Sequence, residues 1–137
     1  MMKLSHIAIA CPELAKLESV FAKLQLKVEE RIDVPSEKVK VAMIPVQMSE
    51  DFRLELLEPT SDDSPIAGFL SQRPRGGMHH VCFEVDGIEA WEKILIREGF
   101  VILPPGIRKG ARGQALFIHP KSMGGVLVEL EEIHSEE

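Results

Sequence analysis

The chain has 137 residues, of which 45% are hydrophobic and 28% are charged, as is ordinary for one compact soluble domain. Its net charge of −6 argues against non-specific binding to nucleic acid or to an anionic membrane, because either would repel it. No apolar run approaches the roughly 20 residues of a membrane helix, and the N-terminus lacks the apolar core of a signal peptide. We therefore expect a cytoplasmic protein whose two cysteines, Cys11 and Cys82, are reduced core thiols.

The first half of the chain predicts a strand, a helix and three further strands. Apolar residues recur at helical spacing in one segment and follow strand patterns in the others. Pro12 lies where the first turn of the helix is expected. The expected ranges are 3–10 for the first strand, 13–25 for the helix, and 26–32, 38–46 and 52–59 for the later strands.

A short helix should follow. Ser64-Pro65 is a cap and first-turn signal for a helix from Ile66 to Gln72. The segment Arg73 to Gly77 then has the composition of a linker. The remaining elements are expected at 78–85 (strand), 87–98 (helix, with Asp86 as its cap), 99–103, 113–119 and 125–132 (strands).

The second half of the chain repeats the first at one constant offset. His6 falls on His80 and Glu55 on Glu129, and both separations are 74 residues. Each half therefore predicts a βαβββ unit, and neither has enough apolar surface to be stable alone. We expect an α+β fold in a single domain over 1–137, with a first unit at about 1–60, a linker helix at about 61–76 and a second unit at about 77–132.

The repeat turns four scattered residues into a candidate metal site. A duplication with approximate two-fold symmetry would bring His6, Glu55, His80 and Glu129 together about its axis. A lone strand histidine is usually a hydrogen-bonded core residue, and a lone glutamate usually faces solvent. Four such residues at matching positions favour a shared site instead. Two imidazoles and two carboxylates suit a divalent ion such as Co, Ni, Zn, Mn or Fe(II).

Around these residues the sequence resembles the vicinal oxygen chelate superfamily, which has the glyoxalase fold, and within it the methylmalonyl-CoA epimerase family. The resemblance covers nearly the whole chain. It implies a cupped eight-stranded mixed sheet, usually in a homodimer. Its most specific segments are Leu54 to Pro59 (LELLEP), Asp63 to Leu70 (DSPIAGFL), Gly77 to Val81 (GMHHV) and His119 to Leu130 (HPKSMGGVLVEL).

The resemblance implies interconversion of (R)- and (S)-methylmalonyl-CoA. A proton leaves the carbon between a thioester and a carboxylate and returns on the opposite face. One divalent ion (cobalt, alternatively zinc, manganese or nickel) chelates the two oxygens and stabilises the enolate. The implied ligands are His6, His80 and Glu129, with Glu55 at a position where the family carries Gln or Glu. Glu129 also resembles a glutamate with an acid–base role.

The second acid–base group is where this chain departs from the family pattern. Some members carry a glutamate on the strand matched by Val39-Lys40-Val41, and this chain has Lys40 there. Lys40 would act as a base only if burial or the metal favoured its neutral form, whereas a strand lysine usually faces solvent. Glu55 is the other candidate, because it is the repeat partner of Glu129.

Cationic residues near the second unit are candidate contacts for a coenzyme A thioester. Arg108, Lys109 and Arg112 lie in one loop and would contact its phosphates, unless the loop is simply solvated. Lys121 and Ser122 would hold the substrate carboxylate or thioester.

Three other functions share parts of this pattern. A lactoylglutathione lyase has a similar metal set, but the Asp-Ser-Pro-Ile-Ala and His-Pro-Lys-Ser segments favour the epimerase. A metal-dependent dioxygenase typically uses two histidines and one glutamate, so a fourth ligand at Glu55 counts against it. A non-catalytic small-molecule binder of the same fold would not need the intact ligands.

Overall fold

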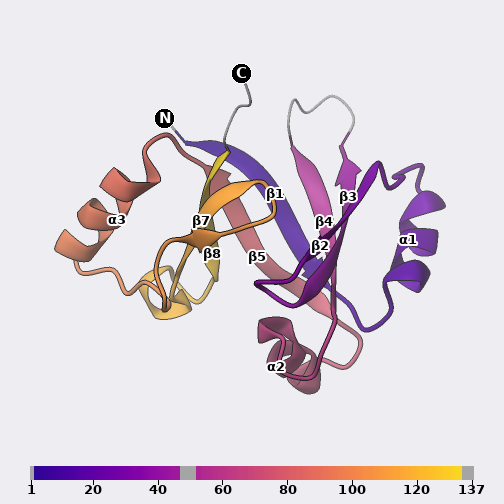
Figure 1. Ribbon diagram of the computed structural model, residues 1–137. Helices are drawn as coiled ribbons and strands as arrows, with labels where there is room; N and C mark the ends of the chain where they lie inside the picture. The colour runs from indigo at the N-terminus through magenta and orange to yellow at the C-terminus, as the bar shows by residue number, and fades with distance from the viewer. Residues whose placement is uncertain (1, 47–51, 134–137) are drawn as a thin grey trace. The chain divides into compact units, whose positions relative to one another are not determined.

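A computed structural model describes residues 2–46 and 52–133 of the chain (Figure 1). The chain divides into two compact units. We call the one that runs from His6 to His79 the N-terminal unit. The C-terminal unit comprises the described residues up to Ser5 and those from His80 onward. No helix in the described part of the chain is long and apolar enough to cross a membrane.

The N-terminal unit has a mixed sheet covered on one face by a helix. Its strands are ordered β2-β3-β4-β1, with β1 parallel to β4 and the other pairs antiparallel. Leu14 of α1 packs with Ala42, Ile44 and Leu56 on one face of this sheet. The elements are β1 (Lys3–Ala10), α1 (Leu14–Ala22), β2 (Glu30–Val34), β3 (Val39–Pro45), β4 (Arg53–Pro59) and α2 (Pro65–Gln72).

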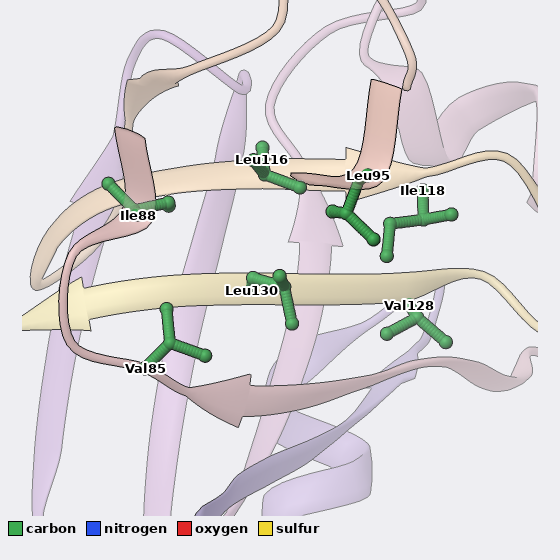
Figure 2. Close-up of a cluster of buried hydrophobic side chains, with 7 residues drawn as sticks. All are labelled: Val85, Ile88, Leu95, Leu116, Ile118, Val128 and Leu130. Atoms are coloured by element: carbon green, nitrogen blue, oxygen red, sulfur yellow. The ribbon is translucent and has the colours of Figure 1, made fainter. Parts of the chain in front are cut away.

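The C-terminal unit repeats this plan. Its strands are ordered β5-β8-β7-β6, and β5 runs parallel to β8. Figure 2 shows the hydrophobic core of this unit, formed between its helix and its sheet. The core consists of Val85, Ile88, Leu95, Leu116, Ile118, Val128 and Leu130. The elements are β5 (Gly77–Glu84), α3 (Ile88–Arg97), β6 (Arg108–Lys109), β7 (Gly113–Ile118), the 3-10 turn η1 (Pro120–Ser122) and β8 (Val128–Ile133).

The predicted repeat extends to the way each helix begins. The Glu58 carboxylate, at the end of β4, accepts a 2.9 Å hydrogen bond from the backbone N–H of Leu14. The Glu132 carboxylate on β8 accepts the same bond, also 2.9 Å, from Ile88. Both pairs are related by the 74-residue offset. A carboxylate at a helix N-terminus satisfies an otherwise unpaired N–H and complements the helix dipole.

Two of the predicted helix starts were wrong in detail. Pro12 lies before α1 rather than in its first turn, because Glu13 is the cap residue. Asp86 does not cap α3; Gly87, with a φ of 68°, holds that position. In both helices the distant glutamate supplies the capping oxygen that local residues do not. The cap of α2 was predicted correctly, since the Ser64 side chain accepts from the Ile66 N–H.

The sixth strand was predicted at 99–103, and this prediction was wrong. Ile102 makes only an isolated bridge to Ile118, and β6 lies further on, at Arg108–Lys109. Pro104 and Pro105 follow directly and have no N–H to donate, so pairing along this segment stops there.

The linker helix α2 and the turn after it belong to the N-terminal unit. Gly76 has a φ of +89°, and a Cβ added there would lie 2.3 Å from the carbonyl oxygen of Ala10. Only glycine permits this approach. Cys11, at the end of β1, is a buried thiol whose pKa is raised to about 11 by burial and by nearby Glu58. It is therefore an inert core thiol, as predicted.

Candidate metal centre

In the N-terminal unit, the predicted site residues lie on the sheet face opposite α1. Strand register places His6 of β1 beside Arg53 of β4, and Ala8 beside Glu55. Because side chains alternate along a strand, His6, Arg53 and Glu55 share one face. The neighbouring residues Leu54 and Leu56 face the core under α1.

These three side chains form a buried charged cluster. Oxygen Oε2 of Glu55 lies 2.8 Å from Nε and 2.6 Å from Nη2 of Arg53. The same oxygen lies 3.2 Å from Nδ1 of His6, and Arg53 Nη2 lies 3.3 Å from that nitrogen. His6, Glu55 and Arg53 are only 2%, 4% and 6% exposed. The Glu55 charge is thus compensated within its own unit, as a buried carboxylate requires.

The C-terminal unit presents the equivalent histidine and glutamate differently. Nε2 of His80 lies 3.0 Å from Oε1 of Glu129, and both residues are buried. Register places Cys82 and Phe117 beside Glu129, on the face opposite α3. The Phe117 ring meets the His80 ring edge-on, with centroids 5.4 Å apart. The Phe117 ring in this position restrains the imidazole and covers one side of it from water.

Two further residues shape the surroundings of Glu129. A Cβ added to Gly110 would lie 3.2 Å from the Ala115 side chain and 4.0 Å from Oε2 of Glu129, so the backbone approaches closely here. Glu131, two residues along β8, is buried and accepts a hydrogen bond from the Ser5 hydroxyl. A second acid therefore shares the Glu129 face of the strand.

The donor set fits a divalent metal ion. Imidazole and carboxylate donors at about 2.0–2.2 Å from one ion lie roughly 3 Å from each other, and the His80–Glu129 separation is 3.0 Å. Buried His6, His80 and Glu129 are the kinds of residue that hold such an ion. In contrast, Glu55 already shares its Oε2 with a guanidinium and an imidazole.

Lys40, the predicted alternative base, does not share a face with Glu55. It is exposed and pairs in register with Glu58 and Asp33. The Glu55 register partner on β3 is Met43, three positions away. An odd separation along a strand reverses the side-chain direction, so this placement argues against Lys40 as an acid–base group.

The predicted cationic loop is split between the two faces of its sheet. Arg108 pairs in register with Ala115, on the Glu129 face, and its guanidinium lies 5.2 Å from the Phe117 centroid. Its Nη2 donates to the carbonyl oxygens of Leu103 and Pro104. Lys109 is exposed and alternates to the opposite face. Arg112 is also exposed.

Lys121 and Ser122 lie in η1, between β7 and β8. The Ser122 hydroxyl accepts a 3.0 Å hydrogen bond from the Val101 N–H, which gives it a structural role. Lys121 is exposed, and its backbone N–H donates to Nδ1 of His119. Within the described residues, no hydrogen bond or ion pair joins either side chain to the His80–Glu129 pair.

Arg53 was missed in the sequence analysis. The sequence could have identified it, because Arg53 and Glu55 are two positions apart in a predicted strand and so share a face. Glu131, two positions after Glu129, carries the same signal. Only the burial of both residues distinguishes them from ordinary surface charges.

Comparison with known proteins defines the class first. Residues 5–117 match the Glyoxalase/Bleomycin resistance protein/Dioxygenase superfamily. The human mitochondrial methylmalonyl-CoA epimerase is 41% identical over 132 residues, which are 95% of this chain and 73% of the relative. The ethylmalonyl-CoA/methylmalonyl-CoA epimerase of Cereibacter sphaeroides is 40% identical over 134 residues, covering 96% of this chain and 98% of the relative.

A solved structure agrees with these relatives. The Streptomyces coelicolor methylmalonyl-CoA epimerase variant in complex with 2-nitronate-propionyl-CoA has a TM-score of 0.88 and 29% identity, over 97% of this chain and 98% of the other. The chain therefore belongs to the glyoxalase superfamily and, within it, to the methylmalonyl-CoA epimerase family. The predicted family and the glyoxalase-like fold class are confirmed.

Proposed function

We propose that this chain interconverts the (R) and (S) forms of methylmalonyl-CoA by removing and returning the α-proton. The observation that carries the proposal is the buried His80–Glu129 pair. It places a carboxylate beside a histidine that can bind a metal, and the Phe117 ring packs against that histidine. Membership of the epimerase family supports the same reaction.

We propose that His6, His80 and Glu129 hold one divalent ion. When bound, such an ion supplies Lewis-acid stabilisation of the negative charge that develops on the thioester and carboxylate oxygens. Cobalt is our first choice, with zinc, manganese and nickel as alternatives. The proposal requires both units to belong to one domain with a cupped sheet, so that the duplicated pairs serve one ion.

Glu129 is the acid–base group that we assign to one face of the substrate carbon. Its carboxylate accepts the α-proton and returns it, and the Phe117 ring helps to exclude water that would otherwise exchange with that proton. Glu55 is the candidate for the opposite face, because its position is equivalent by the repeat. Its contacts with Arg53 also suit a different role, in which it orients His6.

Arg108 is the best-placed residue for the anionic part of the substrate. Its charge lies over the ring that contacts His80, on the same sheet face as Glu129. We assign it to the acyl carboxylate, whereas exposed Lys109 and Arg112 remain candidates for the coenzyme A phosphates. Lys121, in η1, would help to bind the substrate carboxylate or thioester. Ser122 would contribute indirectly, because its hydroxyl holds the backbone at Val101.

Ethylmalonyl-CoA is a second candidate substrate, because the relative from Cereibacter sphaeroides is named for both acyl groups. The same proton transfer would apply to either. We also propose a cytoplasmic homodimer, which sedimentation at several protein concentrations would test. A single species with the mass of one chain would contradict the dimer.

Proton exchange in heavy water tests the function directly. The protein is loaded separately with Co, Mn, Ni or Zn, incubated with methylmalonyl-CoA, and followed by mass spectrometry for deuterium at the α-carbon. We expect exchange together with inversion, and both should be lost after chelation. Ethylmalonyl-CoA and the methylglyoxal–glutathione adduct are the comparison substrates. Turnover of the adduct alone would support the lactoylglutathione lyase alternative and contradict the epimerase.

A further inference from the structure

Gly110 is a glycine that its own backbone conformation does not require. It directly follows β6, and its N–H donates a 2.7 Å hydrogen bond to the carbonyl oxygen of Gly113. Gly106, on the other side of β6, has a φ of +92°, which favours glycine. The φ of Gly110 lies outside that left-handed region, so a residue with a side chain could adopt it. The reason for a glycine here therefore lies in the space that a side chain would fill.

That space borders the Glu129 carboxylate. A Cβ added to Gly110 would lie 4.0 Å from Oε2 of Glu129 and 3.2 Å from the Cβ of Ala115. Strand register places Phe117 opposite Glu129, so Ala115, two positions before Phe117, lies on the Glu129 face. Glu129 is only 7% exposed. A reacting group must therefore approach Oε2 where no side chain stands in the way, and Gly110 keeps one such approach open.

The two oxygens of Glu129 have different neighbours. Oε1 lies 3.0 Å from Nε2 of His80, which is on the side of the proposed ion. Oε2 is the oxygen that faces Gly110. A carboxylate that binds an ion through one oxygen can exchange a proton through the other. The arrangement therefore directs the proton-transfer oxygen toward the glycine.

We propose, on the basis of the proposed function, that Gly110 sets the size of the α-substituent that the site admits. The C–H bond of the substrate breaks as an O–H bond forms at Oε2, and the electron pair stays on the substrate as an enolate. The α-carbon must come within roughly 3–3.5 Å of Oε2 for this transfer. Its substituent, one bond further on, takes the room that a side chain at Gly110 would fill. The site thus accepts malonyl thioesters with a short α-alkyl group.

Gly110→Ala tests the proposal with three substrates that differ only in the α-substituent: malonyl-CoA, methylmalonyl-CoA and ethylmalonyl-CoA. The kcat/KM for α-proton exchange is measured for each in heavy water, with a protein-free blank. We expect the ratio of ethylmalonyl-CoA to malonyl-CoA to fall by about 10- to 200-fold, the usual effect of one carbon in a filled pocket. An equal fall for all three substrates, or no change, would overturn the proposal. Absence of exchange in the unaltered protein would instead contradict the proposed function.

Gly68→Ala is the matched control. Gly68 lies in α2, and a Cβ added there meets no atom within 4 Å. Its kcat/KM ratios should equal those of the unaltered protein. Cobalt affinity, measured by competition with a chromophoric chelator, should be unchanged in Gly110→Ala, because Oε1 is the oxygen on the side of the ion. A loss of cobalt affinity would assign Gly110 to the metal centre and would overturn its role in specificity.

Crowding against Ala115 is another possible cause of a Gly110→Ala effect, because the two Cβ atoms would lie 3.2 Å apart. Comparing Ala115→Gly with the double variant Gly110→Ala/Ala115→Gly removes that contact. Calorimetric titration measures the binding of ethylmalonyl-CoA and malonyl-CoA to both proteins, after circular dichroism has established that they are folded. We expect the double variant to bind ethylmalonyl-CoA, relative to malonyl-CoA, about 10-fold more weakly than Ala115→Gly does. Equal ratios in the two proteins would show that only the Ala115 contact mattered and would overturn the proposal.

Discussion

The two units place a histidine and a glutamate at equivalent positions, but the two pairs are built differently. In the N-terminal unit, Glu55 lies beside Nδ1 of His6 and accepts a hydrogen bond from Arg53. In the C-terminal unit, Glu129 meets Nε2 of His80, and the neighbours are Phe117 and the backbone at Gly110. Arg53 is replaced by Leu127 at the repeat-related position.

We propose that this difference separates a supporting carboxylate from a reacting one. A carboxylate paired with a buried arginine is stabilised as a fixed anion, which suits it to orient a neighbour. The Glu129 carboxylate lies 3.0 Å from an imidazole nitrogen, and we expect it to bind a metal or exchange a proton. The repeat thus carries two histidine–glutamate pairs, and the pair in the N-terminal unit has a buried arginine where the other has Leu127.

The strongest test of this comparison is to remove each carboxylate in turn. Glu129→Gln should lower the rate of α-proton exchange by about 10²–10⁴-fold, because we assign the proton transfer to its carboxylate. Glu55→Gln should lower exchange and inversion together by a smaller factor, on the order of 10–100-fold, through His6. His80→Ala should abolish both. The measurement is deuterium incorporation by the metal-loaded protein.

Glu132→Gln is the matched control for these variants. It removes a third strand carboxylate, which points to the opposite face and contacts the start of α3. Its exchange rate should stay within about twofold of the unaltered protein. If Glu55→Gln instead preserved exchange and lost only inversion, Glu55 would be the second base, and the distinction drawn between the two pairs would be wrong.

A smaller effect is expected from the arginine on the site face of the C-terminal unit. Arg108→Gln should weaken binding of malonyl-CoA by about 10-fold, because it removes the charge-assisted hydrogen bond that we propose to the acyl carboxylate. Binding of propionyl-CoA and of free coenzyme A should be unchanged. Calorimetric titration of the three ligands gives the comparison, with exposed Lys109→Gln as the control. An equal loss for coenzyme A would assign Arg108 to the phosphates instead.

The smallest effect concerns the helix starts, where the units are most alike. Glu58→Ala and Glu132→Ala should each lower the free energy of unfolding by about 1 kcal/mol, as loss of a capping acceptor does. Urea denaturation measures both. Metal affinity should not change, because both carboxylates lie on the faces away from the candidate ligands. Unequal losses would show that the two equivalent hydrogen bonds contribute differently to stability, although their geometry is the same.

The constant offset located both candidate pairs from the sequence, because duplication preserves position. It could not give the contacts of each pair, which depend on unrepeated residues such as Arg53. Lys40 was predicted as a candidate base because it matches a strand position where some family members carry a glutamate. That match does not give the direction of the side chain, which depends on strand register. The sixth strand was misplaced because apolar character at 99–103 outweighed the two prolines that follow.

The glutamates that begin α1 and α3 also bear on how the chain folds. In each unit the carboxylate lies 44 residues after the first residue of the helix that it caps. The first helix of a unit therefore lacks one of its N-terminal partners until the last strand has paired. Local helix formation and distant strand pairing are thereby coupled, which slows the search but makes completion of each unit cooperative.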